Sequence, residues 1–433
     1  MGDQITNYKC PACGGPLHFA AGSGMMECEY CESTFSVAEI ESKYADANAG
    51  AEAAKAEADS AKSAKDEWEV TTEEWIDEGM KAYECPSCGA TLLCDENYGS
   101  SSCPYCGNPT IVPGQFAGTL KPDYVLPFKI TKDEAVNKLK EFYGKKYLVP
   151  KSFKDFSHLE EAKGVYVPFW LYDGYAKGDC RYTGIKKHVE RKGDEEIITS
   201  KYYLVERSGE ERFEKIPTDA SSKMDDSMMD SIEPYDYKDL KPFTKAYLTG
   251  FLSDKYDVSA EEDSVRAMKR AKQSMKDALR DDVKGYDIVN PKKEDIFVKQ
   301  GKAYYSLMPV WMLTTGYNGK NYMFAMNGQT GKAAGELPMD KPKFVITLLI
   351  EFIALFAAAF FLTDFALVAK IVVPAVITLI TAFVLKGTLN NVSARLEASH
   401  YVADNSLKIT GRTDRFLRQT VERRKLNNNS QSN

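Results

Sequence analysis

The sequence has few of the residues on which hydrolytic catalysis usually depends. Its 433 residues include only four histidines, dispersed at positions 18, 158, 188 and 400, and no Ser/His/Asp order or paired-carboxylate motif stands out. A P-loop is also missing. The nearest match ends at Gly331 and Lys332, but Met326 replaces the first glycine and Ala333 the hydroxyl residue that binds magnesium. We therefore expect neither an enzyme nor a nucleotide-driven motor.

Bases are scarce at the front of the chain, and acids are scarce in the tail. Residues 1–44, 45–80 and 81–114 carry net charges of −4, −8 and −2, whereas residues 386–433 carry +5. The acidic front disfavours nucleic-acid binding, because that binding depends on basic side chains that displace counterions from phosphates. The first ten residues, MGDQITNYKC, also lack the apolar region of a secretion signal.

Cysteine, by contrast, follows a repeated pattern. Eight of the ten cysteines form four C-x-x-C pairs, and the second two pairs repeat the first two at a displacement of 75 positions. The predicted ligands are Cys10, Cys13, Cys28 and Cys31 in residues 1–44, and Cys85, Cys88, Cys103 and Cys106 in residues 81–114. Four thiolates ~2.3 Å from one ion make a zinc ribbon, so the sequence predicts two structural zinc ions. The repeated spacing and the missing secretion signal disfavour the alternatives, which are disulfides or a redox dithiol.

Three of the four knuckles have the sequence CPxCG, at 10–14, 85–89 and 103–107. The glycine permits a positive φ that turns backbone amides toward the sulfurs, and the proline fixes the start of the turn. The fourth knuckle departs from this pattern, with Glu32 at the glycine position. We expect His18 to be a strand residue, and Cys94 and Cys180 to be buried apolar side chains.

The composition predicts an acidic linker and a mixed α+β domain. Residues 45–80 form an acidic linker whose alanine-, glutamate- and lysine-rich part favours a solvated helical spacer, with plain disorder as the alternative. Residues 115–340 have the mixed pattern of an α+β domain, within which residues 221–242 are predicted to form an exposed loop.

Two helices of this domain are predicted from their N-terminal signals. Thr131 with Glu134 begins a helix that ends at Gly144. Ser259 with Glu262 begins a second helix, closed by Gly285, whose predicted apolar face is Val265, Met268, Met275, Leu279 and Val283.

Strand-like runs surround these helices, at 165–176, 200–206, 303–317 and 322–326. Asn318 and Gly319 predict a hairpin turn between the last two. Two of the strands share a Pro-x-Trp core, at Pro168 and Pro309, which indicates either an internal duplication or two similar edge strands.

Residues 341–386 predict a transmembrane helical hairpin. The apolar runs 344–362 and 365–385 would each span ~28 to 32 Å, which matches the hydrocarbon core of a bilayer. A soluble buried hairpin is the alternative. We expect Lys370 to reach toward the outer interface and Glu351 to face a partner helix or an oligomer seam.

Basic residues flank the hairpin on its open side. Lys341 and Lys343 precede the first span, and Lys386 and Arg395 follow the second, whereas the turn carries only Asp364. The positive-inside rule therefore predicts that both termini are cytoplasmic. The bases of the tail, residues 387–433, suit anionic headgroups or a solvated helix over 414–425.

The sequence therefore predicts a multidomain protein with two small β zinc ribbons, a mixed α+β cytosolic domain and a two-helix transmembrane hairpin. The CPxCG knuckles resemble transcription factor IIB-type zinc ribbons. Together with the VPFWLYD run at 167–173 and the late hairpin, they resemble bacterial membrane-anchored zinc-ribbon proteins. Members of that group are often labelled helicase-like or primosomal, and some are encoded beside phage-shock-type envelope-stress genes.

This resemblance implies a cytosol-facing adaptor that recruits protein partners to the membrane in envelope stress. The competing hypothesis is a membrane-linked nucleic-acid-binding protein of replication or transcription. The partners expected from the sequence are the lipid bilayer and cytosolic or membrane proteins, and a homo-oligomer is compatible with Glu351 in the first span.

Overall fold

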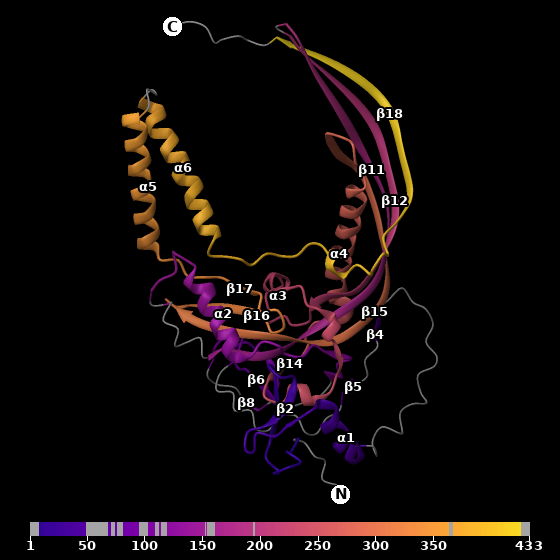
Figure 1. The fold of residues 1–433 in the computed structure, drawn as a ribbon, viewed down its shortest axis with the longest axis vertical. Helices are drawn as coiled ribbons and strands as arrows, with labels where there is room; N and C mark the ends of the chain where they lie inside the picture. Colours follow the sequence, from indigo (N-terminus) through magenta and orange to yellow (C-terminus); the bar gives the residue numbers. More distant parts are fainter. Residues whose placement is uncertain are drawn as a thin grey trace.

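The computed structural model describes residues 8–48, 68–70, 74–75, 81–94, 103–108, 112–113, 119–151, 153, 161–193, 195–362 and 367–425. These residues form a body built on a large sheet. A helical hairpin and a long curved β arm both extend from one side of this body, while the first cysteine group lies on the opposite side, near the N-terminus (Figure 1). Most of the predicted 45–80 spacer lies outside the described residues.

Thirteen strands share the large sheet. They are β4 (Glu69–Val70), β6 (Lys81–Glu84), β7 (Thr91–Cys94), β8 (Val112–Pro113), β10 (Tyr124–Val125), β11 (Lys163–Lys192), β12 (Glu195–Asp219), β13 (Lys241–Pro242), β14 (Leu252–Asp254), β15 (Ile288–Tyr317), β16 (Lys320–Asn327), β17 (Ala333–Gly335) and β18 (Lys408–Lys425). A separate sheet contains β1 (Leu17–Ala20), β2 (Met25–Cys28) and β3 (Thr34–Phe35), and β5 (Glu74–Trp75) pairs with β9 (Thr119–Leu120).

The α-helices are α1 (Val37–Asn48), α2 (Lys132–Gly144), α3 (Asp226–Ile232), α4 (Ala260–Asp281), α5 (Lys341–Leu362) and α6 (Leu367–Gly387). Short 3-10 turns are η2 (Tyr237–Asp239), η3 (Lys245–Leu248) and η4 (Ser399–Tyr401).

The two Pro-x-Trp strands lie at the centre of the sheet, where β11 and β15 run antiparallel to each other. Each indole N–H donates to the carbonyl that lies one residue before the N-cap of a helix. Trp170 donates to Val258 ahead of α4, and Trp311 donates to Ile130 ahead of α2, both at 2.9 Å. The strands are therefore not edge strands, and their matched contacts favour the internal duplication.

The main chain around the two prolines repeats the same pattern. The carbonyl of Pro168 accepts the amide of Ala220 at 2.9 Å, and the carbonyl of Pro309 accepts the amide of Gly328 at 2.8 Å. Proline has no N–H to donate, so at both positions only the carbonyl can form a backbone hydrogen bond to the neighbouring segment. Each tryptophan is thus hydrogen-bonded to the segment that leads into a helix: Trp170 to the start of α4, and Trp311 to the start of α2.

Both helix starts are confirmed. Thr131 and Glu134 form a complete capping box, and α2 ends at Gly144. The Ser259 side chain accepts the amide of Glu262, and α4 ends at Asp281, four residues before the predicted Gly285. The predicted apolar face was wrong at Val265, whose side chain is 63% exposed.

The predicted loop at 221–242 is wrong over its middle, because residues 226–232 form helix α3. Asp225 caps its first turn by accepting the amide of Met228 at 2.9 Å. Met228, Met229 and Ile232 are buried in the core. The run of acids masked this i, i+1, i+4 apolar pattern, and Arg266 lies 3.3 Å from Asp226 and from Asp230 to offset their charge.

The tail also departs from the helical expectation, because residues 408–425 form strand β18. β18 runs antiparallel to β12, from Glu195 opposite Lys425 to Glu210 opposite Lys408. Together with the outer parts of β11 and β15, these strands form the arm (Figure 1). Helix α4 covers one face of the arm base. It can pack closely there because residue 209 is a glycine, and a Cβ at this position would lie only 3.1 Å from Leu279.

The predicted hairpin is present as two helices, α5 and α6, each long and apolar enough to cross a membrane. The Thr381 hydroxyl donates to Glu351 at 2.7 Å, so the acid of α5 faces α6 of its own hairpin. The expectation of a partner helix or an oligomer seam at Glu351 stays a prediction. Lys370 donates to the carbonyl of Phe360 at 3.1 Å, near the end of α5. The turn at Thr363 and Asp364 lies outside the described residues.

Candidate metal centres

Each candidate metal centre is formed by two knuckles, and all four knuckles share the same backbone geometry. In every knuckle the amide of the residue after the second cysteine donates to the carbonyl of the first cysteine, at 2.8 to 3.0 Å. Gly14, Gly89 and Gly107 occupy this position with φ of 77°, 69° and 74°. Glu32 occupies it in the fourth knuckle with φ of 57°, a left-handed conformation that costs a non-glycine residue roughly 1–2 kcal/mol.

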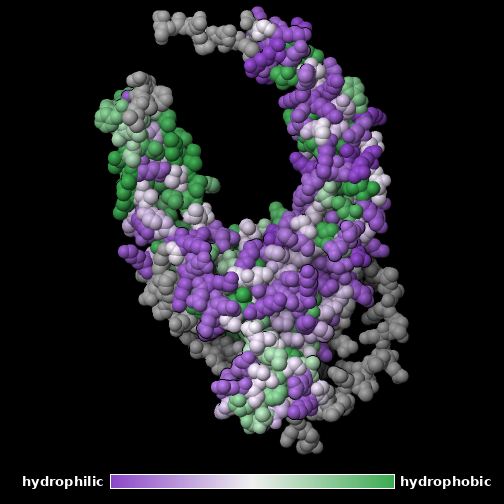
Figure 2. All heavy atoms as spheres, viewed as in Figure 1, coloured by the Kyte–Doolittle hydropathy of each residue, from purple (hydrophilic) through white to green (hydrophobic). Residues whose placement is uncertain are grey.

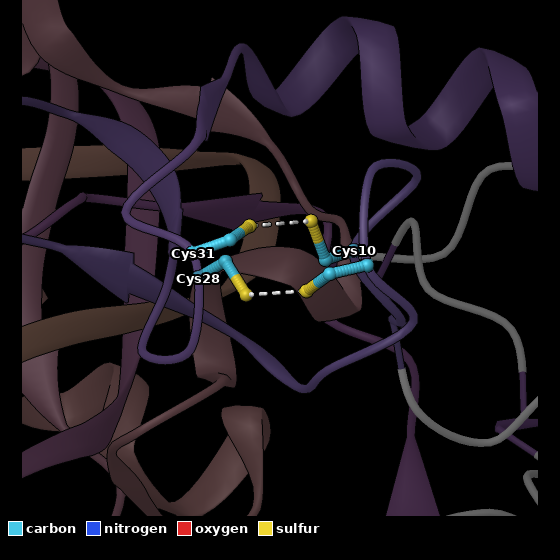
Figure 3. A group of neighbouring side chains, drawn as sticks. Cys10, Cys28 and Cys31 are labelled. Carbon is cyan, nitrogen blue, oxygen red and sulfur yellow. Dashed lines mark hydrogen bonds between the residues drawn. The ribbon is translucent and has the colours of Figure 1, made fainter.

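This geometry brings the eight predicted cysteines together in two groups of four. In the first group, Cys10 Sγ lies 3.5 Å from Cys31 Sγ and Cys13 Sγ lies 3.5 Å from Cys28 Sγ (Figure 3). In the second group the corresponding distances are 3.6 Å for Cys85 and Cys106, and 3.7 Å for Cys88 and Cys103. All four sulfurs of a group lie within 4.8 Å of one another.

These distances fit a single tetrahedral ion. Sulfurs ~2.3 Å from a central ion would be ~3.8 Å apart along each edge of the tetrahedron. Four thiolates complete the shell, so the centres suit a structural ion and leave no position for a substrate or a catalytic water.

The thiols differ in how easily they ionise. The neighbouring Ser33 lowers the pKa of Cys31 to about 6, whereas burial raises the pKa of Cys88 to about 11. Gathering four negative charges in one place is unfavourable without a counter-charge, and a divalent cation supplies it. The donor set therefore favours a bound cation over four free thiols.

The first group lies on a small unit at the surface, here called ribbon 1, which comprises residues 8–48. Cys13 and Cys31 are exposed, and the neighbouring Tyr30 side chain is 76% exposed. Ribbon 1 contacts the body at residues 247–250 and at the start of α2, where a Cβ on Gly22 would lie 2.9 Å from Thr131. Its buried Phe19 and Met26 belong to the same apolar cluster as the body core. The amide of Phe19 donates to Thr249 O at 3.2 Å, and its ring packs edge-on against Tyr247.

The second group lies within the body, in ribbon 2, which comprises the described residues between 81 and 113. Strand β7 of ribbon 2 pairs with β14 of the large sheet, with Leu93 opposite Ser253. The Tyr105 hydroxyl donates to the buried Asp254 at 2.5 Å. Thr314 donates to the carbonyls of Pro104 and Tyr105, at 2.8 and 3.0 Å. The second centre is thus joined to the core by a sheet ladder and side-chain hydrogen bonds.

Other sequence-predicted residues take the expected places. His18 lies in β1, and Cys180 is buried at the base of the arm. The side chain of Cys94 lies outside the described set. Sequence reasoning missed Tyr105 and Asp254, because no local pattern links residues 149 positions apart.

The comparisons with known proteins give one relative to report. Over 340 residues the chain is 31% identical to "Uncharacterized protein YdjG" of Bacillus subtilis (strain 168), an alignment that covers 78% of this chain and 92% of the relative. No family model and no solved structure matches the chain. The resemblance to transcription factor IIB-type ribbons stays a prediction. By the extent and identity of the alignment, the chain belongs to the family of the Bacillus subtilis protein YdjG.

Proposed function

We propose that the protein is a non-enzymatic, membrane-anchored adaptor with two structural zinc ions, whose body lies at the cytoplasmic face. The observation that carries the proposal is the path of the chain. It leaves the body through α5, returns through α6, and then pairs β18 with β12 of the same body. Because both ends of the hairpin are attached to one folded body, the chain must return to the side of the membrane that it left. Two spans meet this requirement.

The returning segment is attached to the body before it reaches β18. The amide of Ser393 donates to the Ser231 hydroxyl at 2.7 Å, and the amide of Ala398 donates to the Ser274 hydroxyl at 2.6 Å. Further along, the Tyr401 hydroxyl donates at 2.8 Å to Glu233, which is buried. These contacts support a tail on the same side of the membrane as the body, and the basic flanks favour the cytoplasm.

The surface of the hairpin supports lipid as its environment. Figure 2 shows a largely apolar surface over α5 and α6. Large side chains such as Phe361 and Phe383 are 79% and 81% exposed. Monomeric soluble proteins rarely expose apolar patches beyond a few hundred Å², so a bilayer is the natural solvent for this surface.

The arm must stay in water although it extends from the same side of the body as the hairpin (Figure 1). β18 contains seven basic and two acidic residues, and nearly all of its side chains are exposed. Charged strands cannot enter hydrocarbon without a large cost. In Figure 1 the arm reaches as far as the end of the hairpin and curves toward it, so insertion of the hairpin requires a different angle between hairpin and arm, with the arm kept beside the membrane.

Ribbon 1 is the ribbon with a free surface for a partner. The corresponding tip of ribbon 2 contacts the body, since Asn321 donates to Cys106 O at 2.9 Å. Tyr30 stands at the exposed tip of ribbon 1 among acidic neighbours. Anchoring this tip at a membrane raises its effective concentration, so that weak contacts gain avidity of about 10²-fold.

The test is crosslinked affinity capture of the full-length protein from membranes, comparing Tyr30→Ala with Phe297→Ala. Phe297 is a matched control because it is a 68% exposed aromatic residue on the arm. We expect Tyr30→Ala to lose a cytosolic protein that wild type and the control retain. Equal capture by both variants would contradict the role of ribbon 1.

A second candidate, nucleic-acid binding, is favoured only by the basic strand β18. Phosphate contacts weaken steeply as salt rises, whereas apolar protein contacts do not. Submicromolar DNA binding by the full-length protein at physiological salt, with a steep salt slope, would replace the adaptor by this rival.

A further inference from the structure

Two adjoining cavities lie at the base of the hairpin, where α5 begins and α6 ends. Their volumes are about 460 and 550 Å³. Lys341 lines both of them, together with Tyr317 and Asn318 of the β15–β16 turn. Lys386 lines the first cavity and Lys151 the second. A pair of hollows thus joins the hairpin to the body.

The cavities are strongly basic. Lys341, Lys386 and Lys151 are exposed, and none forms an ion pair with an acid in the described part of the chain. The two acids that line the cavities are already engaged. Glu336 pairs with Lys320 at 3.1 Å, and Asp340 accepts the amide of Lys343 at 3.0 Å in the first turn of α5. Five lysines and two acids line the two cavities, which leaves a net charge of +3.

The aromatic side chain beside the cavities is a second, independent indication that this region lies at the membrane–water interface. Tyr147 is 57% exposed, and its hydroxyl lies 3.5 Å from Thr347 in the second turn of α5. The ammonium of Lys343 lies 3.8 Å from the centre of the Tyr147 ring. Exposed tyrosines and lysines at the end of a span are typical of the membrane–water interface, where headgroup phosphates lie.

We propose that these cavities bind the phosphate of an anionic glycerophospholipid, held by Lys341 and Lys386 with Lys151 nearby. The proposal rests on the proposed membrane insertion. The ammonium groups supply charge, and the amide of Asn318 is available to headgroup hydroxyls. A bound lipid would contact residues of both the hairpin and the body.

The experiment uses the full-length protein in nanodiscs that contain phosphatidylglycerol and phosphatidylcholine in equal amounts. Native mass spectrometry then counts the lipids that remain bound after release. We expect wild type to retain phosphatidylglycerol preferentially. The double variant Lys341→Gln/Lys386→Gln should lose this retention by on the order of tenfold or more, because each basic residue near an anionic surface contributes roughly fivefold.

The control variant Lys292→Gln/Lys302→Gln removes two exposed lysines of β15 and should behave as wild type. Equal retention of both lipids by wild type, or equal loss in the two double variants, would overturn the proposal. Binding of inorganic phosphate by the detergent-solubilised protein, without any preference for phosphatidylglycerol in nanodiscs, would reassign the site to the free anion.

Failure of the proposed function gives a different result. If the chain does not enter nanodiscs at all, membrane insertion is wrong. If it enters them and shows no lipid preference, only the lipid site is wrong.

Discussion

Ribbon 1 and ribbon 2 have the same four-cysteine spacing but different surroundings. Ribbon 1 packs against Tyr247, Thr249 and Thr131 of the body, and its Cys13 and Cys31 are exposed. Ribbon 2 shares a sheet ladder with β14, and its Cys88 and Cys106 are partly buried. The first cysteine of each knuckle is buried in both ribbons. One metal motif is thus attached to the body in two ways: the strands of ribbon 1 keep to their own sheet and pack against the body, whereas ribbon 2 adds its strands to the large sheet.

This difference sets what each metal ion stabilises. In a small ribbon the free energy of metal binding is largely the free energy of folding that ribbon. Where the ribbon also pairs with the main sheet, losing the ion exposes the neighbouring core. We therefore expect the two centres to differ in how far the damage spreads.

The largest effect should come from removing one centre at a time. Wild type should contain about two zinc ions per chain, and each of Cys10→Ser/Cys13→Ser and Cys85→Ser/Cys88→Ser should lose one, measured by elemental analysis. Only the change in ribbon 2 should lower the stability of the body, by more than about 4 kcal/mol, because loss of a buried metal site is among the most damaging changes. Thermal unfolding followed by near-ultraviolet circular dichroism measures this difference.

Equal destabilisation by the two double variants would break the comparison. One zinc ion or none in wild type, or iron in place of zinc, would contradict the assignment of the centres.

A smaller effect is expected from Tyr105→Phe, which removes the hydroxyl that donates to Asp254. Leaving a buried acceptor without its partner costs about 1–3 kcal/mol. Denaturant unfolding of the body should report this loss. Tyr30→Phe in ribbon 1 is the matched control, and it should leave stability unchanged because that side chain is exposed. No loss in Tyr105→Phe would mean that ribbon 2 contributes little to the core.

The smallest effect should come from Glu32→Gly in ribbon 1. Glycine relieves the left-handed strain at φ of 57° but adds unfolded-state entropy, so we expect a net gain of less than about 1 kcal/mol. The midpoint of zinc transfer to a competing chelator, compared with wild type, measures it. A weaker hold on zinc in Glu32→Gly would show that the glutamate side chain itself supports the knuckle.

Local patterns predicted much of this molecule. The cysteine repeat, the capping box at Thr131 and the Asn318-Gly319 turn are each encoded within a few residues, and the described structure contains all three. The two apolar helices were also evident from composition. The assignment of domain boundaries at 1–44, 81–114 and 115–340 stays a prediction.

What the sequence could not predict depends on distant partners. The tail residues form β18 because β12 offers a long edge, and no property of the tail alone indicates that register. Helix α3 was not predicted because its acidic residues are typical of an exposed loop, and the sequence does not show that Arg266 lies beside them. The different surroundings of the two ribbons likewise arise from contacts with residues 245–254, far from either motif.

In the proposed topology the hairpin crosses the membrane while the body, arm and tail stay on its cytoplasmic side. The most direct test of this topology is labelling of single introduced cysteines by a membrane-impermeant maleimide in intact cells and in inverted vesicles, with wild type as the background control. Asp364→Cys, at a sequence position between the two spans, should be labelled in intact cells, and Val189→Cys, near the tip of the arm, only in inverted vesicles. Labelling of both positions from the same side would contradict this topology.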